Sequence, residues 1–196
     1  DVHTFRGLVH IAQEKRARAV PHFEFAVKSN PNNPVFLNNL GRLYLDLDLV
    51  ELALPFLDRS LKINPREVDT MWAIGGYFTN IGQAERALPY LDKAMAIDPG
   101  HVRVALARGM VFEAMGRAPE AIEAYSKLTK TPETSARALD RLTDLESHDV
   151  SSPVMAEILE QIAKSPRSPS ELGALHTGAA RVYDKNGDYD RAFEHF

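Results

Sequence analysis

The sequence repeats itself with a period of 34 residues, and this constrains the fold more than any other feature. Two proline series, one glycine series and one alanine series keep the interval: Pro21, Pro55 and Pro89; Pro31, Pro65 and Pro99; Gly7, Gly41, Gly75 and Gly109; Ala19, Ala53, Ala87 and Ala121. Four series in step are very hard to produce by chance. The chain is therefore built from copies of one unit that stack on each other.

Each unit contains two helical patterns. Apolar residues recur at spacings of three and four, and no alternating strand pattern competes with them. We expect the first helix of a unit over 35–47 and 68–80, and the second over 51–63 and 84–97. The second helix should end at Asn-Pro or Asp-Pro, because proline cannot continue the hydrogen-bond ladder and disfavours helix in the residue before it. The pattern predicts an all-α chain.

The glycine and alanine series predict how the two helices of a unit pack. A glycine inside a helix costs about 1 kcal/mol relative to alanine, so it needs a packing reason. We expect the alanine of the second helix to approach the first helix where the glycine has no side chain. Bulky residues that follow the two small ones, such as Tyr44 and Leu57, should fill the remaining space between helices.

The spacing resembles the tetratricopeptide repeat (TPR), whose pattern is W-x2-L-G-x2-Y, then A-x3-F, then P. Two full matches are Leu37-x2-Leu40-Gly41-x2-Tyr44 with Ala53-x3-Leu57 and Pro65, and Met71-x2-Ile74-Gly75-x2-Phe78 with Ala87-x3-Leu91 and Pro99. Partial matches retain Gly7, Ala19, Phe23 and Pro31; Gly109, Phe112, Ala121 and Tyr125; and Ala180, Tyr183, Gly187, Ala192 and Phe196. The resemblance implies a right-handed α-α superhelix of about five to six helix-turn-helix repeats.

The repeat pattern also predicts the domain organisation. A regular array is expected over 1–133, with repeats at about 1–33, 34–67, 68–101 and 102–135. Over 134–172 the glycine and alanine are lost but apolar spacing remains. This predicts a degenerate helical pair near 134–146 and 152–164, or alternatively a flexible linker. Ser151-Ser152-Pro153 indicates a helix start, and Ser165-Pro166-Arg167-Ser168-Pro169 a loop before the next helix. A final repeat, 173–196, stops in its second helix, so both ends of the array look truncated.

A second resemblance covers the C-terminal stretch. Leu175-His176, Ala180, Tyr183-Asp184, 187–190 and 192–196 resemble the end of the TPR region in bacterial TPR-containing sulfotransferases. This implies an alternative function, the non-catalytic N-terminal region of a sulfotransferase-like enzyme whose catalytic domain is absent from this chain. The chain has no Gly-rich loop with Lys and Ser/Thr to hold a phosphosulfate donor, so no enzymatic activity is expected of the chain itself.

The TPR resemblance implies a concave groove lined by the first helices of the repeats. The residues expected to bind a partner there are Asn38, Asn39, Arg42, Trp72, Asn80, Arg103 and Met110, within a wider lining that includes Asp46, Gly76, Arg181 and Lys185. Trp72 with Arg42 and Arg103 is the expected binding patch, because aromatic and arginine side chains are the most frequent interface anchors. Packing of Trp72 against a neighbouring helix is the alternative.

Composition excludes several other functions. The absence of cysteine removes disulfides and thiolate chemistry. The 23 basic and 27 acidic residues form no basic block, so nucleic acid is not an expected partner. No apolar run approaches the about 20 residues of a membrane span. No histidine pair has the i, i+4 spacing of a helical metal site, and partial burial is expected of His10 and His176. No cofactor or metal is expected.

The predicted function is therefore that of a non-enzymatic scaffold. It would bind a peptide or protein partner in the groove, through shape and a few anchor residues. Self-association through the terminal repeats is a further expectation, because an uncapped end of an array exposes apolar surface. The partner's identity and the compartment stay open, with the cytoplasm as the default.

Overall fold

The computed structural model describes residues 2–164 and 168–195, and within them it contains twelve α-helices and no strand. The chain divides into two compact units, Asp1–Pro99 and Gly100–Phe196. The predicted all-α class is confirmed. Each unit is described below by itself, and the predicted division at 133/134 and 172/173 stays a prediction.

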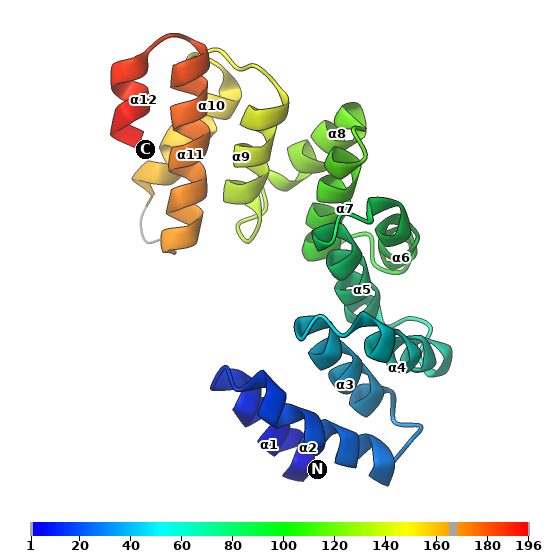
Figure 1. Cartoon of the computed structure of the whole chain (residues 1–196). Coiled ribbons are helices and arrows are strands. Elements are labelled where there is room, and N and C mark those ends of the chain that lie inside the picture. The colour runs from blue at the N-terminus through cyan, green and yellow to red at the C-terminus, as the bar shows by residue number, and fades with distance from the viewer. Residues whose placement is uncertain (1, 165–167, 196) are drawn as a thin grey trace. The chain divides into compact units, whose positions relative to one another are not determined.

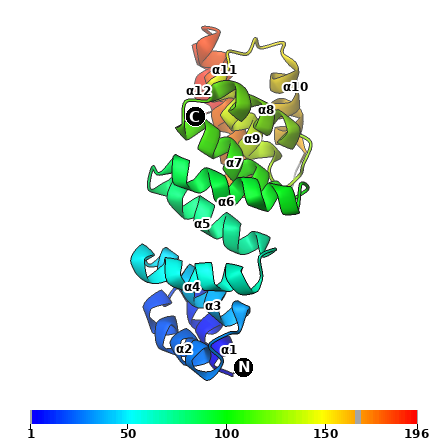
Figure 2. The same cartoon turned by 90° about the vertical axis from the view of Figure 1, so that its right-hand side faces the viewer.

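The first unit consists of three helix pairs. Their helices are α1 (Val2–Ala12) and α2 (Arg16–Ser29), α3 (Pro34–Asp46) and α4 (Val50–Ile63), and α5 (Val68–Asn80) and α6 (Ala84–Ile97). The two helices of each pair pack on each other, and Figure 2 shows these pairs in the blue-to-green part of the chain. In addition, α2 packs on α3, and α3 packs on α5. The four helices predicted between residues 35 and 97 all form, within one residue of their predicted ends.

Local signals set these helix boundaries. The second helix of each pair ends at Asn30, Asn64 or Asp98, and a proline follows each of these residues as predicted. At the start of α3, the Asn33 side chain accepts hydrogen bonds from the backbone N–H groups of Val35 (3.0 Å) and Phe36 (3.4 Å). This cap satisfies two amides that have no partner within the helix.

The turn within each pair requires a left-handed residue. Gly82 takes φ +74° there, whereas Glu14 (φ 58°) and Asp48 (φ 60°) occupy the equivalent positions of the two preceding pairs. Glycine adopts this conformation without strain, and other residues do so at a cost. The first two turns are therefore less favourable than the third.

The helix-interior glycines permit close contact with a bulky residue of the second helix. A Cβ built on Gly41 would lie 2.5 Å from Leu57 Cγ, and one on Gly75 would lie 2.6 Å from Leu91 Cδ2. The predicted approach of the alanine is seen at Gly41, where the Ala53 carbonyl oxygen would lie 3.2 Å from the Cβ, although the leucine makes the closer contact. Leu57 and Leu91 are fully buried, so they have no room to withdraw.

Side-chain hydrogen bonds act between and within the helix pairs of the first unit. The Tyr44 hydroxyl of α3 donates to Glu24 of α2, in the preceding pair, at 2.7 Å. The Ser60 hydroxyl of α4 donates to the Pro34 carbonyl of α3, in the same pair, at 2.9 Å. Burial, and then the hydrogen bond to Glu24 and its charge, raise the pKa of Tyr44 to about 12. The neutral phenol is thus the form that the fold stabilises.

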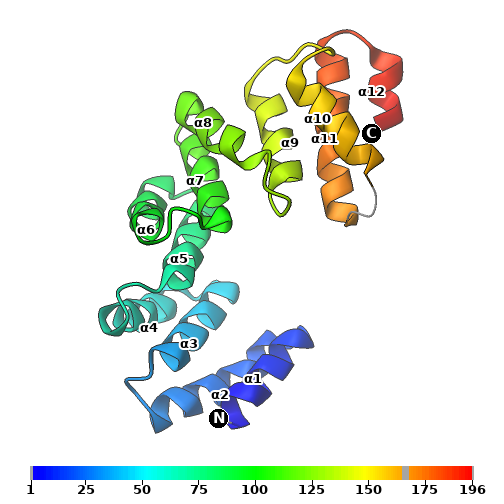
Figure 3. The ribbon, with the colours of Figure 1, turned by 180° about the vertical axis from the view of Figure 1, so that it is seen from behind.

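The second unit contains the remaining six helices. These are α7 (Val102–Ala114), α8 (Ala118–Leu128), α9 (Ser135–Leu145), α10 (Pro153–Ala163), α11 (Pro169–Lys185) and α12 (Tyr189–His195). Figures 1 and 3 both show α11 between α9 and α12, and α11 packs on each of them. A core cluster contains residues of α9, α10, α11 and α12, among them Leu139, Met155, Ile158, Leu175 and Val182.

The degenerate stretch forms α9 and α10, near the two ranges that the apolar spacing predicts, and its assignment as a TPR-like pair stays a prediction. Ser152 caps α10, with Pro153 in its first turn, as the sequence predicts. Ser168 and Glu171 form a capping box at the start of α11, while Ser165, Pro166 and Arg167 of the predicted loop lie outside the described residues, as does Phe196. Both α9 and α10 pack more extensively on α11 than on each other.

We predict that two adjacent glycines of α5 respond in opposite directions to the same substitution. Gly75→Ala places a methyl group against buried Leu91, so the free energy of unfolding should fall by about 1–2 kcal/mol. The methyl group of Gly76→Ala meets no atom within 4 Å. Because alanine has the higher helix propensity, this variant should raise the free energy of unfolding by up to about 1 kcal/mol. Urea unfolding followed by circular dichroism measures both changes. Equal effects of the two variants would contradict the glycine contact.

We also predict that Tyr44 makes stability sensitive to alkaline pH. Its pKa in the folded protein is about 12, above the usual 10.0, so its contribution is complete below pH 10 and is lost as pH rises from 10 to 12. Tyr44→Phe removes the bond to Glu24 and should cost about 1 kcal/mol at pH 8. Urea unfolding at pH 8, 10 and 11 should show a smaller alkaline loss in Tyr44→Phe than in the wild type, and identical losses would rule Tyr44 out as a source.

Candidate functional site

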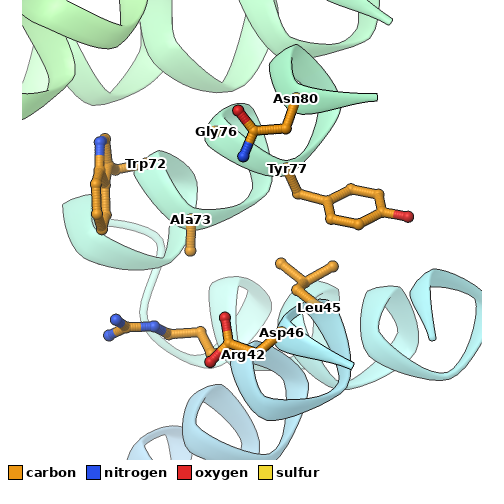
Figure 4. Close-up of a pocket in the computed structure, with 8 residues that line it drawn as sticks. All are labelled: Arg42, Leu45, Asp46, Trp72, Ala73, Gly76, Tyr77 and Asn80. Carbon is orange, nitrogen blue, oxygen red and sulfur yellow. The ribbon is translucent and has the colours of Figure 1, made fainter. Parts of the chain in front are cut away.

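A pocket of about 370 Å³ lies between α3 and α5 in the first unit. Arg42, Leu45 and Asp46 line it from α3, and Trp72, Ala73, Gly76, Tyr77 and Asn80 line it from α5 (Figure 4). Three of the seven residues predicted to bind a partner, Arg42, Trp72 and Asn80, therefore share one pocket. Gly76 and Asp46 of the wider predicted lining also belong to it.

The pocket is open because Gly76 has no side chain. A Cβ at Gly76 would meet no atom within 4 Å, in contrast to neighbouring Gly75. At intervals of 34 residues the same position holds Leu8, Arg42 and Met110, all of which have long side chains. Gly76 thus has no packing reason of the kind that explains Gly75, and its effect is to leave a hollow in the surface of α5.

Aromatic side chains form two sides of the pocket. Trp72 and Tyr77 both come from α5 and are both partly exposed, and Figure 4 shows their rings on opposite sides of Ala73. The Tyr77 hydroxyl donates to Asp48 at 2.9 Å, which fixes that ring. Burial first, and then the bond to Asp48, raise the pKa of Tyr77, so this phenol is neutral at physiological pH.

Polar groups occupy the edge of the pocket. Arg42, Asp46 and Asn80 are exposed, and they supply a cation, an anion and an amide within one small surface. Leu45 and Ala73 provide apolar atoms beneath them. Apolar walls with a few polar groups at the edge are typical of sites that bind another molecule.

Asn38 and Asn39 lie on α3, N-terminal to the pocket residues of that helix, and both are half-buried. Asn38 Oδ1 is buried and has no hydrogen-bond partner within the described residues. Since Asn38 precedes Arg42 by one helical turn, the two residues share a face of α3. Asn38 thus lies on the same face of α3 as Arg42 but does not line the pocket.

The other two predicted residues belong to the second unit. Arg103 is exposed and Met110 is half-buried, both on α7. That they continue the surface of the α3–α5 pocket stays a prediction.

The expected groove residues Arg181 and Lys185 bind α9. Arg181 donates to Asp140 Oδ1, the Asp140 carbonyl and Thr143 Oγ1, each at 2.9 Å. Lys185 donates to the Thr143 carbonyl at 2.9 Å. Asp140 is buried, and the Arg181 guanidinium compensates its charge. Both basic residues therefore hold α11 against the end of α9, and their place in the groove lining stays a prediction.

Sequence reasoning missed Leu45, Ala73 and Tyr77. The signal that could have identified them is the helical period, because Leu45 follows Arg42 by three residues and Tyr77 follows Ala73 by four. A second polar hollow, at 186–190, surrounds the turn between α11 and α12. There Asp188 is already bound by the Arg191 side chain and caps α12.

Within residues 2–164 and 168–195, the structure contains neither a candidate metal site nor a candidate membrane-spanning helix. No group of three or more His, Cys, Asp or Glu side chains is arranged to hold a metal ion. No helix in the same residues has both the length and the apolar character needed to cross a membrane.

Comparison with solved structures shows the fold. A tetratricopeptide repeat protein from Parabacteroides merdae matches with a TM-score of 0.71 and 19% identity, covering 98% of this chain and 74% of its own. The structure of pilF from Pseudomonas aeruginosa matches with a TM-score of 0.77 and 17% identity, covering 100% and 87%. PilW, described as a type IV pilus biogenesis factor, matches at 0.74 and 16%, covering 99% and 89%.

Comparison of the sequence gives the family. No curated protein matches the chain. Two family models, both described as tetratricopeptide repeat, match residues 6–68 and 82–143. Together they cover well over half of a chain whose helices pair as that repeat requires. The chain belongs to the tetratricopeptide repeat family.

Proposed function

We propose that the chain is a scaffold that binds an extended segment of a protein partner at the α3–α5 pocket. The observation that carries the proposal is the open space at Gly76 in the interior of α5. A Cβ there would meet no atom within 4 Å, and the missing side chain leaves room for the pocket. Such a glycine costs about 1 kcal/mol relative to alanine. A binding role accounts for this cost, whereas packing does not.

The pocket chemistry suits one anchoring side chain of a partner. Trp72 offers an aromatic wall, and aromatic residues lose little conformational entropy when they bind. The hollow above Gly76 would admit a bulky side chain between Trp72 and Tyr77. Arg42 and Asp46 at the edge would select the charge of the residues next to that anchor.

The asparagines suit the partner's backbone. Asn38, Asn39 and Asn80 each carry an amide that both donates and accepts hydrogen bonds, which is what an extended peptide backbone needs. Asn38 Oδ1 is buried and lacks a partner within the described residues, so the Asn38 side chain would have to turn outward before it could accept an N–H group of the partner. That Arg103 and Met110 of α7, in the second unit, bind the same partner stays a prediction.

We predict that filling the hollow weakens partner binding without unfolding the protein. Affinity capture with the full chain, followed by mass spectrometry, identifies candidate partners, and calorimetry with a purified partner gives the dissociation constant. Gly76→Leu should raise this constant by at least about tenfold, because its side chain occupies the pocket. Trp72→Ala should raise it by about 30-fold, as expected for an aromatic anchor worth about 2 kcal/mol.

The matched control is Gly173→Leu. Gly173 also lies inside a helix, α11, and a Cβ there also meets no atom within 4 Å, but it lies outside the pocket. It should bind the partner as well as the wild type does. Wild-type affinity in Gly76→Leu would refute the proposed site, provided that circular dichroism shows both variants folded.

Self-association is a second proposal, favoured by apolar surface on both terminal helices. Phe5 of α1 is 68% exposed and Phe193 of α12 is 83% exposed, and Val2, Phe25 and Tyr189 are exposed beside them in their respective units. Large exposed apolar groups on a protein surface favour contact with another copy.

We predict that the full chain associates at high micromolar concentration and that Phe5→Asp or Phe193→Asp reduces this association, because a charge in an apolar contact must be desolvated. Sedimentation velocity between about 5 and 500 μM measures the effect. A wild-type monomer across this range would disprove the proposal. The control is Leu159→Asp, a similar change at an exposed residue of α10, away from both terminal helices.

The sulfotransferase alternative stays a prediction. The described residues that carry this resemblance lie in α11, α12 and the turn between them, and Tyr183 and Ala192 among them are buried. The residues between 168 and 195 thus serve the helical array.

A further inference from the structure

Ring contacts recur at one position of the repeat, and the terminal repeats use histidine there. Between α3 and α4, the ring centroids of Tyr44 and Phe56 lie 5.9 Å apart. Between α5 and α6, those of Phe78 and Tyr90 lie 6.2 Å apart. At the equivalent positions of the first and last pairs the contacts are His10 with His22 (5.4 Å) and Tyr183 with His195 (5.6 Å).

A second histidine joins each terminal contact. His3 Nδ1 lies 3.4 Å from His22 Nδ1, and His176 Nδ1 lies 2.9 Å from His195 Nδ1. Both pairs are separated by 19 residues in sequence and connect the two helices of one repeat. The inner repeats place Leu37 and Met71 where the terminal repeats place His3 and His176. The repeats at the two ends of the chain thus share a polar contact that the inner repeats lack.

The chemistry of this contact depends on protonation. Two Nδ1 atoms at hydrogen-bond distance need one N–H donor and one bare nitrogen acceptor. If both imidazoles are protonated, two N–H groups and two positive charges face each other, and the contact becomes repulsive. Two nitrogens alone do not make a metal site, and the search over the described residues gave no third ligand.

The neighbouring charges of the first pair reinforce the repulsion. His22 faces His3, His10 and Arg6, and burial, followed by these charges, lowers the pKa of His22. From α3, which packs on the other side of α2, Tyr44 contributes a neutral hydroxyl that is bound to Glu24.

The last pair has an acidic neighbour as well as a basic one. Burial and then the charge of His176 lower the pKa of His195, while Glu194 acts in the opposite direction. On the α9 side of α11, Asp140 and Asp144 are paired with Arg181. The helix α10, which also packs on α11, contributes Glu157, bound by Gln161 and paired with Lys130.

Little else holds the terminal helices. Gly7 is the only buried residue of α1, and Ala192 is the only one of α12. By comparison, α3 buries six residues. A repulsive histidine contact would therefore act on the two helices that have the smallest apolar contribution to resist it.

We propose that the two histidine pairs are acid-sensitive latches, in which protonation releases α1 from α2 at one end of the chain and α12 from α11 at the other. The folded repeats disfavour the protonated forms of His22 and His195 relative to the unfolded chain. The latches are therefore closed above the usual histidine value of 6.5 and open progressively as the pH falls below it. Acidification loosens both terminal repeats and leaves α3–α6 in place.

Hydrogen exchange of the full chain at pH 7.5 and 5.0, corrected for the intrinsic pH dependence of exchange, tests the proposal. Amide protection in α1 and α12 should fall by at least about tenfold at pH 5.0 relative to that in α3–α6. The double variant His176→Leu/His195→Phe copies the inner pair Leu37 and Phe56. It should keep α12 protected at pH 5.0 while α1 still opens, and His3→Leu/His22→Phe should do the reverse.

An unchanged acid response of α12 in His176→Leu/His195→Phe would overturn the proposal, as would a wild type whose terminal helices do not respond. NMR titration of the histidine ring protons tests the pairing without relying on helix protection. His176→Leu should raise the pKa of His195 towards 6.5, because it removes a neighbouring positive charge. A pKa of His195 that does not move in this variant would also overturn the proposal.

Discussion

The contact between a helix-interior glycine and a bulky side chain of the next helix determines how each regular repeat packs. It occurs between Gly7 and Phe23, Gly41 and Leu57, Gly75 and Leu91, and Gly109 and Tyr125. Because a Cβ on the glycine would overlap the larger residue, the two helices approach more closely than ordinary side chains allow. This contact fixes the rotation of the first helix, and thereby turns Arg42 of α3 and Trp72 of α5 towards the same pocket.

The second unit keeps helical packing with different chemistry. At Gly178 a Cβ would lie 3.4 Å from Ile158 Cδ1 and 3.5 Å from the Asp140 Cα, so α11 lies close to both α9 and α10 without the severe overlap seen in the regular repeats. Arg181 then binds Asp140 and Thr143, and these polar contacts join α11 to α9. Loss of the glycine and alanine pattern in the degenerate pair therefore changes the helix partners and leaves the helices intact.

The parts of the structure that the sequence predicted depend on local chemistry. Proline after Asn64 and the Ser152 cap mark helix ends because their effects reach only one turn. The importance of Gly76 could not be predicted, since only the fold shows that Gly75 points into the repeat and Gly76 into the pocket. The bond between Arg181 and Asp140 could not be predicted, because Asp140 lies 41 residues away in a repeat without the pattern. The histidine pairs were missed because their nitrogens meet across two helices.

Trp72 is the only tryptophan in the chain, so its fluorescence reports on the pocket alone. Titrating a purified partner into the full chain, with acrylamide quenching measured at each point, therefore tests the central claim that this pocket is where the partner binds. The account predicts a shift of emission to shorter wavelength and reduced quenching at saturation, because the bound segment covers a partly exposed indole. Unchanged emission and unchanged quenching with a saturating partner would contradict it.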